Sequence, residues 1–143
     1  MTLDRSLCTL AVAALTVVTA ATPARADLGG SYHCRVRVHG TIEDRYLASG
    51  AESGPLGCPL ASERAAWNGG RYEDFAGGSI YWSPDTGAVI VKGAIHDHWY
   101  ADRRCIGYPL ADEGPAADGG RTQSFQNGHV WLSAAGDSYS ATC

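Results

Sequence analysis

The sequence is first informative in what it does not contain. After the N-terminal 26 residues, no apolar run approaches the length of about 20 residues that a membrane span requires. No stripe of Lys and Arg is present, so neither nucleic acid nor anionic lipid is an expected partner. The G-x-S-x-G nucleophile elbow and the Gly-rich phosphate loop with its Lys are also missing. The partners that remain are neutral or cationic polymers, small ligands and proteins.

The N-terminal 26 residues have the features of a secretory signal peptide. Asp4 and Arg5 precede an apolar run, Leu7–Ala21, and Ala24-Arg25-Ala26 forms an A-x-A cleavage site. We predict cleavage before Asp27, which leaves 117 of the 143 residues, enough for one domain with a modest core. The mature chain keeps 9 basic and 14 acidic residues, a net charge of −5. The expected location is secreted, in the cell wall or extracellular.

Four cysteines remain once Cys8 leaves with the signal peptide: Cys34, Cys58, Cys105 and Cys143. An even number in an exported chain predicts two disulfides, and three pairings are possible. We favour Cys34–Cys143, which would join the two ends of the domain, together with Cys58–Cys105. Zinc is the alternative, but no C-x-x-C pair exists and the thiols are widely spread, so no metal or other cofactor is expected.

The main positive feature is a segment that occurs twice. The segment Gly69–Ser83, GGRYEDFAGGSIYWS, returns as Gly119–Ser133, GGRTQSFQNGHVWLS, at a constant offset of 50 residues. A fixed period of this size is typical of repeat proteins, in which each unit is one supersecondary element. In the first copy, Arg71–Phe75 and Ser79–Ser83 have the pattern of a β-hairpin.

Short helices and further strands are expected around these hairpins. An isoleucine and an aromatic residue four positions apart indicate a helix at Thr41–Ala48 and another at Gly93–Ala101. Alternation predicts one half-buried strand at Tyr32–Val38, and β-branched residues predict a strand at Ala88–Lys92. Ser138–Cys143 is either an edge strand or a tail. The predicted fold is β-rich with short helices: two helix–turn–three-strand meander units, blade-like and antiparallel, closed by terminal pieces. Self-assembly into a larger ring is the alternative.

The domain organisation follows from this order of elements. Residues 1–26 are the signal peptide, and residues 27–143 form a single repeat domain. This domain has a terminal strand and partial unit (31–53), a full repeat (54–103) and a degenerate repeat (104–143).

Each repeat contains a Gly/Pro turn with a glutamate four residues after the proline. The structural motif residues are Leu56, Gly57, Pro59 and Glu63, and then Ile106, Gly107, Pro109 and Glu113. Glycine supplies backbone freedom and proline fixes the exit of the turn. We predict that each glutamate binds backbone N–H groups of the following Gly-Gly turn. A glycosidase pair is less favoured, because repeat symmetry tends to separate the two carboxylates and to make their environments alike.

The order L-G-x-P, E, D/N-G-G-R-Y and F-x-x-G-S-I-Y-W-S-P-x-T-G-A resembles the LGFP-repeat family. The first copy, Leu56–Ala88, matches this pattern nearly throughout, whereas the second, Ile106–Ser133, departs at His129–Leu132 and lacks the Pro-x-Thr-Gly. The family comprises exported cell-envelope proteins whose repeats occur alone or attached to hydrolases and acyltransferases. The resemblance therefore implies association with the cell wall rather than catalysis.

Candidate binding residues follow from the alternation of side chains along the strands. Ile80 and Trp82 share one face, and their aliphatic equivalents in the second copy mark that face as core. Tyr81 and Trp131 are then predicted to face outward, where sugar rings can stack on them. The alternative, which is more common in small β domains, is that these rings cap the core against a helix with Trp99. The binding candidates are Tyr81, Trp131, His129, Tyr72 and Arg71.

We therefore expect a secreted, non-catalytic repeat protein that associates with the cell wall by binding envelope polysaccharide or a peptidoglycan-linked polymer. The first alternative is a secreted protein-binding or self-assembling module, either inhibitor-like or a surface component, with homo-oligomers as an option. A small cell-wall hydrolase ranks third because no catalytic set converges. His96 and His98 predict no metal site, since residues two apart on a helix point to different sides.

Overall fold

A computed structural model describes residues 29–141, so the predicted signal peptide and Cys143 lie outside the described residues. The strands are β1 (Ser31–His33), β2 (Val36–Val38), β3 (Arg64–Ala65), β4 (Arg71–Phe75), β5 (Gly78–Ser83), β6 (Gly87–Val91), β7 (Gly114–Pro115), β8 (Arg121–Phe125), β9 (Gly128–Leu132) and β10 (Ser138–Ala141). The helices are α1 (Gly40–Ala48) and α2 (Gly93–Ile106), with 3₁₀ turns η1 (Ala51–Ser53) and η2 (Trp67–Gly69). Neither helix in this part of the chain has the length and apolar character needed to cross a membrane.

The strands form three antiparallel sheets, none of them closed into a barrel. One is the hairpin β1–β2, and the other two have the orders β3-β4-β5-β6 and β7-β8-β9-β10. The predicted β-rich, antiparallel class with short helices is confirmed. Each unit gains a fourth strand of two residues, β3 or β7, which is too short to leave a pattern in the sequence. The last segment is an edge strand, since β10 pairs with β9.

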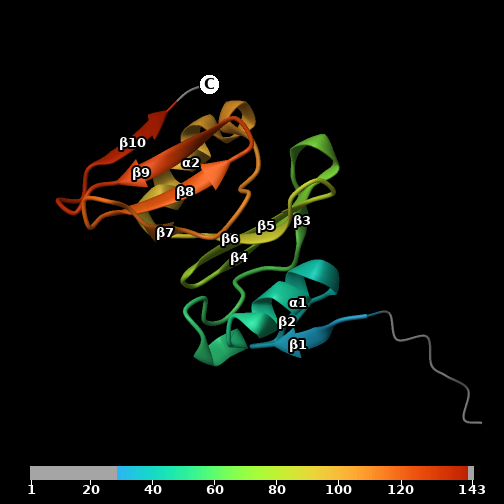
Figure 1. Ribbon diagram of the computed structural model, residues 1–143. Helices are drawn as coiled ribbons and strands as arrows, with labels where there is room; N and C mark the ends of the chain where they lie inside the picture. The colour runs from blue at the N-terminus through green and yellow to red at the C-terminus, as the bar shows by residue number, and fades with distance from the viewer. Residues whose placement is uncertain (1–28, 142–143) are drawn as a thin grey trace, which may run out of the picture.

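The helices and sheets are stacked in chain order. One core lies between α1, the hairpin and the first sheet, and it contains Val38, Ile42, Tyr46, Leu56, Phe75, Ile80 and Ile90. The other core joins α2 to both four-stranded sheets and contains Tyr81, Val91, Ile95, Trp99, Ile106, Tyr108, Phe125 and Val130. Figure 1 shows α1 and the hairpin at one end of the molecule and the second sheet with α2 at the other. This is the stacked architecture expected of a repeat protein.

The helix aromatic of each unit explains why the L-G-x-P turn recurs. Tyr46 donates a hydrogen bond from its hydroxyl to the carbonyl of Gly57 at 2.8 Å, and Trp99 donates from Nε1 to the carbonyl of Gly107 at 2.9 Å. Both glycines have positive φ values, 64° and 86°, which favour glycine over other residues. The motif therefore presents a carbonyl oxygen to the buried aromatic residue of its own unit.

The N-terminal segment differs from its prediction as one strand. The chain reverses at Cys34 and Arg35, whose φ values of 48° and 74° give a tight two-residue turn between β1 and β2. His33 then contacts the edge of Tyr46, with ring centroids 5.0 Å apart, much as Tyr81 contacts Trp99 at 4.6 Å. The hairpin therefore takes the place that β5 and β6 would have in a preceding unit, and it covers α1.

Both predicted disulfide pairings are wrong, because Cys34 is bonded to Cys58. The bond ties the N-terminal hairpin to the first L-G-x-P turn, and it does not join the ends of the domain. The proposed Cys58–Cys105 bond assumed equivalent positions, but the residue 50 positions after Cys58 is Tyr108. Cys105 is also disulfide-bonded.

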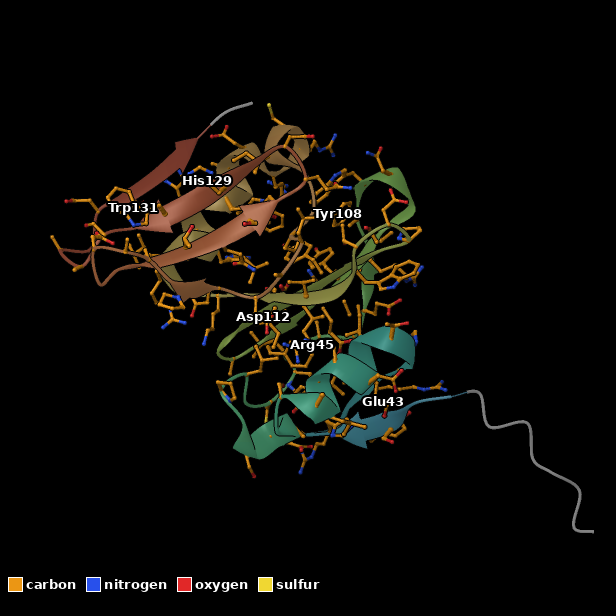
Figure 2. All side chains as sticks on the ribbon, in the orientation of Figure 1. Glu43, Arg45, Tyr108, Asp112, His129 and Trp131 are labelled. Atoms are coloured by element: carbon orange, nitrogen blue, oxygen red, sulfur yellow. A yellow bond between two sulfur atoms is a disulfide. The ribbon has the colours of Figure 1, made fainter. Side chains whose placement is uncertain are left out.

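The second unit closes the edge of the first sheet. The backbone N–H of Ile90 on β6 donates to Asp112 Oδ1 at 3.0 Å, and Gln123 Nε2 donates to the carbonyl of Ile90 at 2.8 Å. Arg45 of α1 forms an ion pair with the same Asp112, and Figure 2 shows the two side chains meeting at this junction. An exposed strand edge is thereby covered, and the two units are fixed against each other.

Candidate functional site

The prediction that Tyr81 faces outward is wrong. The side chain is 2% exposed, lies edge-on against Trp99 and stacks on Tyr72 across the β4–β5 pair at 5.3 Å. The strand alternation was assigned correctly, but α2 of the following unit covers this face of the sheet. The alternative arrangement, in which the ring caps the core against a helix, is the one observed for Tyr81.

Among residues 29–141, no helix packs on the equivalent face of the second sheet, and this face is called the uncovered face below. Trp131 is half-buried there and donates from Nε1 to Asp118 Oδ1 at 3.2 Å, while His129 is exposed. Figure 2 shows both residues on β9, at the opposite end of the molecule from the hairpin. Arg71 lies on the other face of the first sheet, where it forms an ion pair with Glu63. The five predicted binding residues therefore do not form one site.

The predicted role of the motif glutamates is also wrong. Glu63 pairs with Arg71 and lies 4.0 Å from His39 Nδ1, and Glu113 pairs with Arg121 at 2.9 Å and Lys92 at 3.3 Å. The turn amides are satisfied elsewhere, since Gly70 N–H donates to the carbonyl of Trp67 and Gly120 N–H donates to Asp118 Oδ1. Each glutamate thus joins its own sheet to the residue that precedes the helix of its unit.

Tyr72 and Tyr81 instead help to line a pocket at the junction of the two units. This aromatic pocket has a volume of about 250 Å³. Its walls come from β3, η2, β4 and β5 of the first unit and from α2, and they comprise Ala65, Ala66, Trp67, Tyr72, Tyr81, Tyr100, Arg103 and Arg104. Two neighbouring units are therefore needed to build it.

The aromatic walls of the pocket are held in place by the core. Trp67 stacks on Tyr108 at 4.2 Å with an angle of 16° between the rings, and the Tyr108 hydroxyl donates to the carbonyl of Trp67 at 2.5 Å. Figure 2 shows Tyr108 at the junction between the units. Tyr72 and Tyr81 are nearly parallel, with 9° between their rings. These contacts fix the ring orientations before any ligand binds, which reduces the entropy lost on binding.

The rim of the pocket is positively charged. The Arg103 guanidinium carbon lies 3.7 Å from the centroid of the Tyr100 ring, which is cation–π geometry. Arg64, which also pairs with Asp74, donates from Nη1 to the hydroxyl of the wall residue Tyr72 at 3.5 Å. Burial raises the pKa of the Tyr81 phenol, and Asp74 raises it further, so this wall is uncharged at neutral pH.

Sequence reasoning missed Trp67, Tyr100, Arg103 and Arg104. The second helix was predicted to end at Ala101, but it continues to Ile106, and Tyr100 and Arg103 lie three residues apart on one face. That spacing was a usable signal. Trp67 lies in a 3₁₀ turn where no periodic pattern marks the direction of a side chain.

Between residues 29 and 141, no three His, Cys, Asp or Glu side chains gather in a way that could hold a metal ion. His96 stacks on Tyr100 at 5.5 Å, whereas His98 Nδ1 lies 3.1 Å from Ser138 Oγ on β10. The two histidines therefore point to different elements.

Stacked units of one helix and one small antiparallel sheet, tied together by side chains of the next unit, define a repeat protein. The LGFP repeat family matches residues 56–104 and 106–141, more than half of the chain, and the chain belongs to this family. The two matches start 50 residues apart, at the L-G-x-P turn of each unit. Repeats of this family occur in cell-envelope proteins. No curated protein matches the chain.

Proposed function

We propose that this protein is exported, is not an enzyme and associates with the cell wall by binding envelope polysaccharide in the aromatic pocket. The observation that carries the proposal is the set of four aromatic side chains, Trp67, Tyr72, Tyr81 and Tyr100, around one opening of about 250 Å³. Tyrosine and tryptophan combine an apolar ring with a polar group, and a sugar presents the same combination. The Cys34–Cys58 disulfide supports an extracytoplasmic location, because such bonds persist in oxidising compartments.

The non-catalytic role is supported by the state of the acidic residues. Each motif glutamate forms an ion pair with the arginine at the equivalent position of its own sheet, Arg71 or Arg121. A glycosidase instead needs two carboxylates with different environments across one cleft. The ion pairs of the two motif glutamates therefore favour a structural role in each repeat over a catalytic one.

The test is binding of the mature chain to isolated cell walls and to the polysaccharide released from them. We expect the double variant Tyr72→Ala, Tyr100→Ala to bind about two- to tenfold more weakly, from the usual value of an aromatic contact. Tyr32→Ala is the matched control, because Tyr32 is 75% exposed on the N-terminal hairpin. If the folded wild type and the folded pocket variant bind cell walls equally well, the aromatic pocket is not the polysaccharide-binding site.

A self-assembling or protein-binding module is the second candidate. The uncovered face of the second sheet, with Trp131 and His129, favours it, because the same face of the first sheet is covered by a helix. Native mass spectrometry across a concentration series distinguishes the two candidates. Oligomers that form without any affinity for walls would favour this second function.

A further inference from the structure

The two arginines that line the aromatic pocket lie beside its aromatic walls. Five cations form ion pairs with carboxylates through side-chain nitrogens, namely Arg45, Arg64, Arg71, Lys92 and Arg121. Arg103 and Arg104 line the pocket, and neither has a carboxylate within ion-pair distance in the part of the chain that the structure describes. The chain as a whole has a net charge of −4. Arg35 and Arg37 on the N-terminal hairpin also form no ion pair among the described residues, so what distinguishes Arg103 and Arg104 is that both line the aromatic pocket.

A structural explanation accounts for only part of this arrangement. Basic residues in the last turn of a helix interact favourably with the helix dipole, and both arginines lie in the last turn of α2. That interaction does not require the Arg103 guanidinium to lie over the Tyr100 ring beside the pocket. Arg103 is held there by Nη1, which donates to the carbonyl of Tyr100. A guanidinium has five N–H donors, so most of them stay available to an acceptor in the pocket.

We propose that the aromatic pocket binds an anionic saccharide, a sugar unit that carries a carboxylate or a phosphate group. The sugar lies against Trp67 and Tyr72, and its oxyanion accepts hydrogen bonds from Arg103 and Arg104. Carboxylate and phosphate share the acceptor chemistry that a guanidinium binds in a bidentate manner. A volume of about 250 Å³ lies just below the usual range for drug-sized ligands, which suits a ligand as small as one sugar unit.

This inference rests on the proposed polysaccharide binding and specifies its ligand. The net negative charge alone favoured neutral or cationic polymers as partners. At the aromatic pocket, Arg103 and Arg104 favour an anionic ligand instead. The acidic residues elsewhere on the protein oppose this only weakly, because their interactions with a ligand weaken with distance and salt. A cationic rim in an acidic protein also orients an anionic ligand toward this opening.

The experiment titrates the mature chain with glucuronic acid, glucose 6-phosphate, glucose and inorganic phosphate, followed by amide NMR shifts at the pocket residues. We expect the two charged sugars to bind about tenfold more tightly than glucose, as charge-assisted hydrogen bonds are roughly twice as strong as neutral ones. The variant Arg103→Gln, Arg104→Gln should remove this difference and keep the weak binding of glucose. The matched control, Arg35→Gln, Arg37→Gln, removes the same charge from the N-terminal hairpin and should keep the difference.

The outcomes separate this inference from the proposed function. Equal affinity for glucose and glucuronic acid refutes the preference for an anion and leaves polysaccharide binding in place. Inorganic phosphate that binds as tightly as glucose 6-phosphate refutes the saccharide part, because the sugar then contributes nothing. If the control variant Arg35→Gln, Arg37→Gln also binds charged sugars no more tightly than glucose, the overall charge of the protein is responsible. That result also refutes the assignment of the anion contact to Arg103 and Arg104.

Discussion

Replacing Glu73 with glutamine should stabilise the protein at neutral pH and have little effect in acid. Glu73 lies on β4, on the face that α1 covers, and it is 1% exposed. Neither carboxylate oxygen has a hydrogen-bond partner among the described residues. Its repeat equivalent is Gln123, whose Nε2 donates to the carbonyls of Ile90 and Ala111, both at 2.8 Å. The first unit therefore has an unpartnered acid where the second has an amide whose Nε2 donates two hydrogen bonds.

The magnitude follows from the pKa of this carboxyl. Burial raises the pKa of Glu73 from 4.5 to about 8, and the charges of Glu63, Asp74 and Glu43 add to the effect. Between these two values the folded protein keeps a proton that the unfolded chain has released, so stability falls as the pH rises. Each pH unit in this interval costs about 1.4 kcal/mol. The cost at pH 7 is therefore on the order of 3 kcal/mol, and it disappears near pH 4.

Urea unfolding of the mature chain at pH 4 and pH 7 tests this reasoning. Glu73→Gln should raise the free energy of unfolding at pH 7 by about 2–3 kcal/mol and leave it nearly unchanged at pH 4. Asp85→Asn is the matched control, because Asp85 is exposed in the β5–β6 turn and should change stability by less than about 0.5 kcal/mol. An equal stabilisation at both pH values would show that the gain comes from the amide hydrogen bonds, and the pKa argument would then be refuted.

Two further changes probe the fold. Removing the Cys34–Cys58 bond with Cys34→Ser, Cys58→Ser should lower the free energy of unfolding by about 3–4 kcal/mol, since the bond spans 24 residues; a loss below about 1 kcal/mol in a urea titration would contradict this. Gly70→Ala should lower the free energy of unfolding by about 1–3 kcal/mol, because the new Cβ would lie 2.1 Å from the Tyr108 hydroxyl, which donates a hydrogen bond to Trp67. Gly114→Ala is its control, as nothing lies within 4 Å of the added carbon, and equal thermal shifts for the two variants would disprove the steric reasoning.

The features that the sequence predicted are the local ones. The hairpin of β4 and β5 and the start of both helices follow from turn residues and periodicity, which depend on neighbouring positions. The burial of Tyr81 depends instead on which element covers its face, and alternation within a strand cannot show this. Likewise, the turn at Cys34 and Arg35 contains no glycine or asparagine that would mark it.

The aromatic pocket was only partly predictable for the same reason. Tyr72 and Tyr81 were candidates, but their grouping with Arg103 and Arg104 depends on how the second unit packs on the first. That packing is set by contacts such as Arg45 with Asp112, which lie 67 residues apart. A repeat period shows that two units are alike, and it does not show how one is placed on the other.

The face of the second sheet that carries Trp131 differs in chemistry from the face of the first sheet that α2 covers. Thr122 and Ser124 stand where the first sheet has Tyr72 and Asp74, and His129 replaces Ser79. A third helix laid against this surface would meet Trp131, two hydroxyls and an imidazole, in place of the stacked Tyr72 and Tyr81 of the face that α2 covers. To pack a further unit against this sheet by protein engineering, these positions would first have to be changed to the residues found at the equivalent positions of the first sheet.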